Sequence, residues 1–348
     1  MKGLVIGKFY PPHLGHSYLI DYALAHSDTV DVLICDSSKY VIPARQRQLW
    51  LQAIHPTANV RIIPDLDDDD NSQAWADHTR AFLGYSPDIV FSSENYGAPY
   101  ATFMNADHHM VDLARLHIPI SATRVRENII REWQYLHPIV KADLAIRVVV
   151  IGAESTGTTT LARDIAKKLR APWVPEYGRL YSEGLLSANH KWNNEDFVHI
   201  AATQQRIEKR IASQSNGIIV CDTNASATQL WQKRYLHTTS KRVHEIAMHD
   251  KVNFYVITGD EIPFVQDGTR DGEHIRHAMH QDFITHVKKS GVPYLIVTGS
   301  KVSRLKQTMS AINRLLNHAA IIKDPKTATI VGPVVVRRSR PEPIALVR

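Results

Sequence analysis

Short runs of β-branched and other apolar residues alternate with helix-like stretches along most of this 348-residue chain, in two separate series. In the first series the apolar runs lie at 4–6, 30–35, 60–63 and 89–92, with helical patterns at 15–26, 44–54 and 72–83. Such alternation predicts a parallel sheet with helices on both faces. Ligands of such sheets bind at the carboxyl ends of the strands, so we expect chemistry in the loop after 4–6.

A second alternating series begins after Pro138, where His137-Pro138 is expected to end a helix. Its predicted strands lie at 147–151, 217–222, 253–258 and 294–297, and its predicted helices at 159–170, 195–214, 273–290 and 300–318. Because the chain is too long for one ordinary core, we predict two α/β domains, at 1–140 and 146–318. Four prolines interrupt 319–348, which we expect to be a flexible tail.

Composition indicates a globular protein: 44% of the residues are hydrophobic and 22% are charged, and no apolar stretch is long enough to cross a membrane. The first strand follows Met1-Lys2-Gly3 without a signal peptide, so we expect a cytoplasmic protein. Cys35 and Cys221 lie in separate apolar runs and are read as buried hydrophobic residues. The net charge of +6 is spread along the chain, and we expect neither nucleic acid nor a membrane as partner. The acidic run at 65–70 is read as a solvated loop.

The loop after the first strand reads Gly7-Lys8-Phe9-Tyr10-Pro11-Pro12-His13-Leu14-Gly15-His16. A helix that begins near Gly15 would place His13 and His16 beside its positive end, where a triphosphate can be held, and Gly15 would permit a close backbone approach. About 105 residues later, the segment 120–126 supplies hydroxyls and guanidinium groups at another helix start.

Together these two segments resemble the nucleotidyltransferase superfamily, with its HxGH and ISxTxxR motifs. The resemblance implies direct attack of a substrate phosphate on the α-phosphorus of ATP with Mg²⁺, in which His13, His16 and Arg126 are catalytic. The residues expected to bind ATP in this domain are Gly7, Lys8, Phe9, His13, Gly15, His16, Ser121, Thr123 and Arg126.

A glycine-rich phosphate loop lies between the predicted strand 147–151 and the next helix. Such loops normally carry a lysine at the position that Thr158 occupies in this chain. Another cation, Arg270 or Arg163, is therefore expected to replace the lysine. Thr159 and Asp222 are predicted metal ligands, and Asp222 is also counted as catalytic with Arg270. The residues expected to bind ATP in this domain are Gly152, Glu154, Ser155, Thr156, Gly157, Thr158, Thr159 and Thr160.

Over about residues 1–318, the order of these motifs resembles the NadR-type bifunctional nicotinamide-nucleotide adenylyltransferases and ribosylnicotinamide kinases. The resemblance implies an N-terminal Rossmann-like domain that converts NMN to NAD and a C-terminal P-loop kinase domain that converts nicotinamide riboside to NMN. The expected ligands are therefore ATP, NMN, nicotinamide riboside and NAD, with Mg²⁺ as cofactor; the sequence leaves a homo-oligomer open. Because the first predicted strand begins within the first few residues of the sequence, no helix-turn-helix repressor domain is expected. Candidate substrate contacts are Trp75, Glu176, Tyr177 and Arg179.

Two alternatives stay open at this point. The first domain could transfer a nucleotide to FMN, phosphopantetheine or a glycerol phosphate. Alternatively, Thr158 could mark an inactive kinase domain that binds ATP as a sensor.

Overall fold

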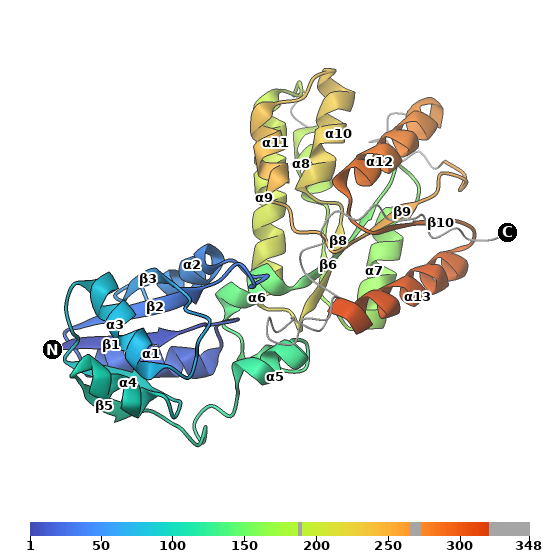
Figure 1. Cartoon of the computed structure of the whole chain (residues 1–348). Helices are drawn as coiled ribbons and strands as arrows, with labels where there is room; N and C mark the ends of the chain where they lie inside the picture. The colour runs from blue at the N-terminus through green and yellow to red at the C-terminus, as the bar shows by residue number, and fades with distance from the viewer. Residues whose placement is uncertain (187–189, 265–272, 320–348) are drawn as a thin grey trace. The chain divides into compact units, whose positions relative to one another are not determined.

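The computed structural model describes residues 1–186, 190–264 and 273–319 (Figure 1). They form two compact units, here called unit 1 (Met1–Val140) and unit 2 (Lys141–Ala319). Each unit is built on its own five-stranded sheet, in which every strand pair is parallel. The two alternating α/β patterns therefore correspond to two α/β folds. Arg270 and residues 320–348 of the predicted tail lie outside the described residues.

The sheet of unit 1 has the strand order β3-β2-β1-β4-β5. Its strands are β1 (Lys2–Gly7), β2 (Thr29–Asp36), β3 (Asn59–Pro64), β4 (Ile89–Ser92) and β5 (Asp107–Met110). The helices of the unit are α1 (Leu14–Ala25), α2 (Ala44–Ile54), α3 (Ser72–Leu83), α4 (Gly97–Met104) and α5 (Ala122–Glu127), with a 3₁₀ turn η1 (Trp133–Tyr135). Since β1 lies between β2 and β4, the order reverses there and a crevice opens at the carboxyl end of β1.

Both faces of this sheet are buried. Successive side chains on a strand point to opposite faces, and each set packs in a core cluster of its own. Val5 and Val32 pack in one core cluster with residues of α1 and α2, such as Ile20 and Leu51. The alternate strand residues Leu4, Ile6, Leu33 and Ile63 pack with Trp75 and Ala76 of α3 and with Tyr100, Ala101 and Met104 of α4. This two-sided burial holds the strand ends that carry the site.

Unit 2 has the strand order β10-β9-β6-β8-β7. The strands are β6 (Ile146–Ile151), β7 (Trp173–Val174), β8 (Ile218–Asp222), β9 (Phe254–Thr258) and β10 (Tyr294–Val297). The helical elements are α6 (Pro138–Leu144, which spans the boundary between the units), α7 (Thr158–Leu169), α8 (Tyr177–Leu186), α9 (Asn194–Ser213), α10 (Ala225–Leu236), α11 (Lys241–Met248), η2 (Glu273–Ile275), α12 (Arg276–Ser290) and α13 (Lys301–Ala319). Here β6 is the strand at which the order reverses, between β8 and β9.

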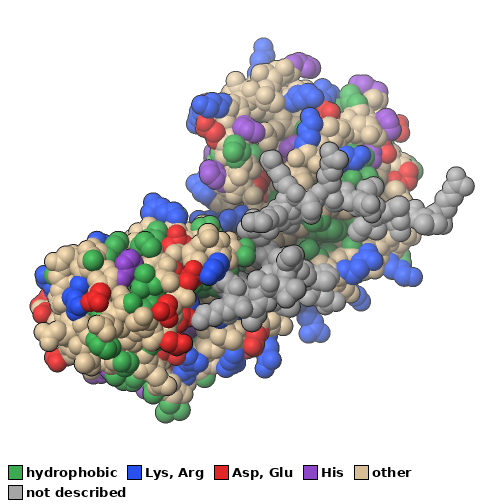
Figure 2. All heavy atoms as spheres, viewed as in Figure 1, with side chains coloured by type: hydrophobic (Ala, Val, Ile, Leu, Met, Phe, Trp, Pro, Cys, Tyr) green, Lys and Arg blue, Asp and Glu red, His purple; other side chains and the backbone are tan. Residues whose placement is uncertain are grey.

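In Figure 1, α7 and α13 lie on one side of the second sheet, and α8, α9, α10 and α11 lie on the other. Every residue of β6 is buried, which suits a central strand covered on both faces. On the face shown in Figure 2, Lys and Arg side chains are dispersed over both units rather than gathered in one patch. No described helix is long and apolar enough to span a membrane.

The predicted α/β class is confirmed, and Cys35 and Cys221 are buried free thiols as expected. The sequence analysis missed one strand of the first sheet and misplaced one helix boundary. The missed strand, which pairs with β4, is the polar segment Asp107–Met110. Pro138 begins α6 instead of following a helix that ends at His137, since proline suits the first turn, where its missing N–H needs no partner.

Candidate functional site

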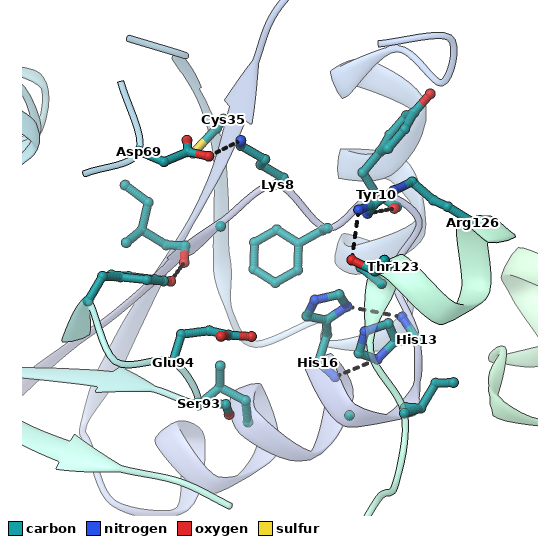
Figure 3. Close-up of a pocket in the computed structure, with 18 of the residues that line it drawn as sticks. Lys8, Tyr10, His13, His16, Cys35, Asp69, Ser93, Glu94, Thr123 and Arg126 are labelled. Carbon is teal, nitrogen blue, oxygen red and sulfur yellow. Dashed lines mark hydrogen bonds and ion pairs between the residues drawn. The ribbon is translucent and has the colours of Figure 1, made fainter. Parts of the chain in front are cut away.

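A cavity of about 620 Å³ lies at the carboxyl end of β1 in unit 1 (Figure 3). Of the predicted site residues, Gly7, Lys8, Phe9, His13, Gly15, His16, Trp75, Thr123 and Arg126 line it. Ser121 instead caps α5: its side chain accepts a hydrogen bond from the N–H of Arg124 at 3.3 Å. The structure therefore brings together the segments around 7–16 and 120–126, although about a hundred residues separate them.

His13 and His16 are held by each other's main chain at the start of α1. The N–H of His16 donates to Nδ1 of His13 at 3.3 Å, and the N–H of His13 donates to Nδ1 of His16 at 3.2 Å. The two rings stack with centroids 3.6 Å apart. Because both Nδ1 atoms accept, each neutral ring carries its proton on Nε2 and keeps a donor for a ligand. A Cβ on Gly15 would lie 3.1 Å from the His13 ring. The absence of a side chain at Gly15 therefore leaves room for the stacked rings.

Both imidazoles are kept neutral by their surroundings. Burial lowers the pKa of His13 well below its ordinary value, with further contributions from His16, Arg115 and Arg126. Burial, followed by Arg115 and Arg126, lowers the pKa of His16 to about 3. An anion bound at these rings would offset the two guanidinium charges and raise both pKa values. The pair is therefore suited to donate hydrogen bonds to phosphate oxygens.

Two guanidinium groups line the cavity beside the histidines. Arg126 donates to the main-chain O of Tyr10 and to Oγ1 of Thr123, both at 3.1 Å, which ties α5 to the loop after β1. Arg115, which the sequence analysis missed, pairs with Glu94 at 2.7 Å. Its signal in the sequence was weak, because it lies in an irregular loop with no motif around it. Arg115 and Arg126 together place two guanidinium groups on the cavity wall, a pattern that suits phosphate oxygens.

The opposite wall carries Lys8, whose Nζ lies 2.8 Å from Oδ2 of Asp69. Asp69 belongs to the acidic run at 65–70, and Asp67 of the same run lines the cavity and pairs with Lys39 at 2.9 Å. The run is an exposed loop before α3, as predicted, and two of its carboxylates also line the cavity. Trp75 is 8% exposed, packs in the core and also lines the cavity, with Nε1 donating to the main-chain O of Asp68.

Arg47 of α2 is fully buried under this site. It donates to the main-chain oxygens of Lys8 and Cys35, at the ends of β1 and β2, and its guanidinium lies 4.9 Å from the ring centroid of Tyr40. The buried charge is thus supported by main-chain acceptors and aromatic rings. Arg47 thus ties the start of the loop that carries Lys8 to the end of β2.

Unit 2 carries the phosphate loop between β6 and α7, beside a cavity of about 390 Å³. Ser155 and Gly157 have positive φ values of 59° and 82°. Alternation of such left-handed residues turns successive N–H groups toward one point, which makes a concave anion site. A Cβ on Gly152 would lie 2.2 Å from Oγ1 of Thr258, so glycine is required there. The predicted residues Gly152, Glu154, Ser155, Gly157, Thr158, Thr159 and Thr160 all line this cavity.

Thr156 anchors the loop from beneath. Its Oγ1 lies 2.6 Å from the main-chain O of Ala153 and 2.7 Å from Oγ1 of Thr258. The guanidinium of Arg304, on α13, donates to the main-chain O of Thr156 at 2.7 Å and of Gly259 at 3.1 Å. Thr156 is 1% exposed and is not among the cavity-lining residues, so it supports the loop from the core side.

Asp222 closes β8 and faces the loop. Burial raises the pKa of Asp222, while hydrogen bonds from the hydroxyls of Thr159 and Thr158 oppose that rise. Thr159 and Asp222 thus offer adjacent oxygen ligands of the kind that Mg²⁺ prefers. Among the residues that the structure describes, no group of three or more His, Cys, Asp or Glu side chains could hold a metal by itself. An ion here would need phosphate oxygens as further ligands.

The segment Glu176–Arg179 includes the last residue before α8 and the first turn of that helix. Glu176 and Arg179 line the cavity, and burial with the nearby Asp222 raises the pKa of Glu176 to about 8. Tyr177 does not line it: its hydroxyl lies 3.0 Å from Nε2 of His199. Arg163 stacks over Trp173 at 4.4 Å and is also absent from the lining residues.

An aromatic wall, which the sequence analysis missed, closes the far side of this cavity. The wall residues come from α9, α10, α12 and the segment before α9: Trp192, Phe197, Trp231, Tyr235 and Phe283. Trp192 and Tyr235 stack with centroids 5.5 Å apart, and Trp231 meets Phe283 edge-on at 5.8 Å. Such rings suit a planar, aromatic ligand. Their spread over four segments left no local pattern to detect.

Comparison with known proteins agrees with this two-unit arrangement. A family model described as an AAA domain matches residues 147–304. The "Trifunctional NAD biosynthesis/regulator protein NadR" of Escherichia coli (strain K12) is 27% identical over 292 residues, which cover 77% of this chain and 71% of that protein. The protein of the same name from Salmonella typhimurium (strain LT2) is 26% identical over 311 residues, which cover 82% and 76% respectively.

Two solved structures share the fold at 20% sequence identity. Each match covers 91% of this chain and 96% of the other. A NadR protein in complex with NAD and AMP-PNP superimposes with a TM-score of 0.68, and a NadR protein in complex with NR superimposes with a TM-score of 0.71. The similarity therefore extends over both units.

Proposed function

Because this chain is a NadR-like protein across both of its units, we propose that it is a bifunctional enzyme of NAD biosynthesis. Unit 2 phosphorylates nicotinamide riboside with ATP to give NMN. Unit 1 then transfers the adenylyl group of a second ATP to NMN to give NAD. The observation that carries the proposal is the pair of separate phosphate sites, each at the reversal strand of its own sheet.

In unit 1 the triphosphate of ATP binds at the start of α1. The Nε2–H groups of His13 and His16 donate to phosphate oxygens, and Arg126 neutralises the charge that develops on the leaving pyrophosphate. A phosphate oxygen of NMN attacks the α-phosphorus, and the bond between that phosphorus and the β-phosphate oxygen breaks. Catalysis by this site is orientation and charge stabilisation, with no covalent enzyme intermediate.

In unit 2 the phosphate loop holds ATP, and the aromatic wall holds the nicotinamide ring of the riboside. Thr159 and Asp222 would hold Mg²⁺, which when bound neutralises charge on the β- and γ-phosphates. Glu176 accepts the proton of the riboside 5′-hydroxyl as that oxygen attacks the γ-phosphorus and ADP leaves. The raised pKa of Glu176 suits such a proton acceptor.

The test is incubation of the purified chain with ATP, Mg²⁺ and nicotinamide riboside while NMN and NAD are both followed. We expect NMN to appear first and NAD to follow. A parallel panel supplies FMN, phosphopantetheine, glycerol phosphate and NMN with ATP or CTP. Absence of NAD formation from NMN would overturn the assignment of unit 1, and transfer to another phosphate would replace it.

Thr158 favours a second candidate for unit 2, an ATP-binding sensor without kinase activity. The hydroxyl of Thr158 bonds to Asp222 and cannot bridge the β- and γ-phosphates as a lysine would. Binding of ATP by unit 2 without phosphorylation of nicotinamide riboside would support this candidate.

A further inference from the structure

The phosphate site of unit 2 is short of positive charge. Three carboxyl groups line its cavity, those of Glu154, Glu176 and Asp222. Thr158 stands where other phosphate loops place a lysine. Among the described residues that line the cavity, Arg179 is the one Lys or Arg side chain. ATP carries about four negative charges, so a cation has to replace the missing lysine if the site is to transfer a phosphoryl group.

The fold places Arg179 next to the phosphate loop. In the register of β7 and β8, Val174 lies beside Cys221, the residue before Asp222. Since α8 starts at Tyr177, its first turn leaves the sheet next to Asp222. Arg179 lines the same cavity as Asp222 and Glu176, and its charge favours the ionised form of both carboxyls. Asp222 in turn bonds to the hydroxyls at the start of α7.

The other described candidate, Arg163, also favours the ionised carboxyl of Asp222, but only Arg179 of the two lines the cavity. The guanidinium of Arg163 stacks over Trp173 at 4.4 Å. Arg179, by contrast, pairs with Glu183 at 3.0 Å through an ion pair in which both side chains are nearly half exposed. Exposed pairs of this kind contribute at most about 1 kcal/mol, so loss of the pair with Glu183 by itself costs little.

We propose that Arg179 replaces the phosphate-loop lysine and binds the γ-phosphate of ATP during phosphoryl transfer. This inference rests on the proposed ATP-binding role of unit 2. A guanidinium can hold two phosphate oxygens at once, whereas an ammonium acts as a point charge. In this chain the stabilising cation therefore comes from α8 instead of α7.

The test is a charge-rescue experiment on the full chain with Arg179→Ala, Thr158→Lys and the double variant. Arg179→Ala should slow phosphorylation of nicotinamide riboside by at least about a hundredfold, the range for loss of one charge-stabilising donor. It should weaken AMP-PNP binding at least tenfold and ADP binding less than threefold, with NAD in excess to occupy unit 1. Thr158→Lys in the double variant should restore both losses to within tenfold of the wild type.

The matched control is Arg206→Ala on α9, whose guanidinium is exposed and bonds to Thr203. It should change neither quantity. The proposal is overturned if Arg179→Ala keeps normal AMP-PNP binding, or if Thr158→Lys fails to restore it, since Arg179 would then serve another purpose. It is also overturned if Arg163→Ala or Arg270→Ala shows the loss and the rescue instead.

Failure of the proposed reaction is recognised separately. A wild-type chain that binds AMP-PNP but phosphorylates no nicotinamide riboside would contradict kinase activity, while the binding comparison would still decide the role of Arg179. A wild-type chain in which unit 2 binds no AMP-PNP would overturn both.

Discussion

The imidazole of His16 combines two properties that suit it to phosphate binding. It is neutral because burial and two guanidinium groups lower its pKa to about 3, and its proton is fixed on Nε2 by the bond that Nδ1 accepts. A ligand phosphate therefore meets an oriented donor.

We predict that His16→Ala slows NAD formation from NMN by about two orders of magnitude, equivalent to about 3 kcal/mol of lost transition-state stabilisation. Phosphorylation of nicotinamide riboside should stay within twofold of the wild type. The matched control is His26→Ala, at the other end of α1, where the ring is exposed and bonds to the main-chain O of Tyr22. Coupled assays of NMN and NAD check both steps. Normal adenylylation by His16→Ala would refute the assigned role.

The proposed proton acceptor in unit 2 gives a prediction about pH. Burial raises the pKa of Glu176 to about 8, and only the ionised carboxylate can accept a proton. The rate of riboside phosphorylation should therefore rise with pH up to about 8 and level off above it. Glu176→Gln should lower that rate at least about a hundredfold and remove the pH dependence, as loss of a general base does. A variant that retains the wild-type pH profile would exclude Glu176 from this role.

Many of the predicted residues that line a cavity lie at a single strand–helix junction. Gly7, His13 and His16 belong to one loop, and Gly152 and Thr159 to another, so local order places them together. Arg115, Glu94 and the aromatic wall come from separate loops and helices, and their meeting depends on tertiary packing. Tyr177 was predicted from its motif, but the direction of its side chain away from the cavity is set by contact with His199.

Among the elements, strands were predicted where burial imposes an apolar pattern. Strand β4 has three buried residues in an apolar run, whereas its neighbour β5 reads Asp-His-His-Met and lies at the edge of the sheet. An edge strand has a neighbouring strand on one side only and is less buried than a central strand. Polar residues are therefore tolerated in it, and the apolar pattern disappears. The apolar residues at 118–120 form no strand, since Pro119 interrupts them and only Ile120 is buried.

Helix α13 supports the phosphate loop through one side chain. Arg304 is 3% exposed and donates to the main-chain oxygens of Thr156, Gly259 and Gly299 and to the carboxylate of Glu261. Removal of the guanidinium leaves two buried carbonyl groups, of Thr156 and Gly259, without this donor. Each unsatisfied buried group costs about 1–3 kcal/mol.

We therefore predict that Arg304→Ala destabilises unit 2 by about 3 kcal/mol or more and weakens AMP-PNP binding there, because the loop loses its support. The control is Arg314→Ala, an exposed position on the same helix. Urea unfolding monitored by tryptophan fluorescence gives the stability, and calorimetry with NAD in excess gives the affinity. Equal stability of the two variants would contradict the supporting role of Arg304.

Considered as a whole, the chain places opposite kinds of titrating groups in its two units. In unit 1 burial lowers the pKa of His13, His16, His55 and His108. In unit 2 burial raises the pKa of four carboxyl groups, those of Glu176, Glu208, Asp222 and Asp250. Burial also lowers the pKa of one histidine of this unit, His286. The two units should therefore respond to pH in opposite directions.

The direction in which the stability of each unit changes with pH follows from proton binding. A histidine whose pKa is lowered on folding binds more protons when unfolded, so unit 1 loses stability as pH falls below 6.5. A carboxyl whose pKa is raised on folding binds more protons when folded, so unit 2 loses stability as pH rises above about 4.5. Each fully buried group contributes up to about 1.4 kcal/mol per pH unit in its window. Between pH 7.5 and 5.5, unit 1 should become less stable and unit 2 more stable.

Hydrogen exchange resolved by peptide measures this directly, because β1 and β2 report on unit 1 while β6 and β8 report on unit 2. After correction for the intrinsic exchange rate at each pH, protection should fall in the first pair of strands and rise in the second as the solution is acidified. Glu208→Gln should weaken the response of unit 2 and leave that of unit 1 unchanged, since Glu208 is 4% exposed and Gln204 bonds to its carboxylate at 3.2 Å. A parallel change of protection in both units would show that they unfold as one body and that these buried groups do not control their stability.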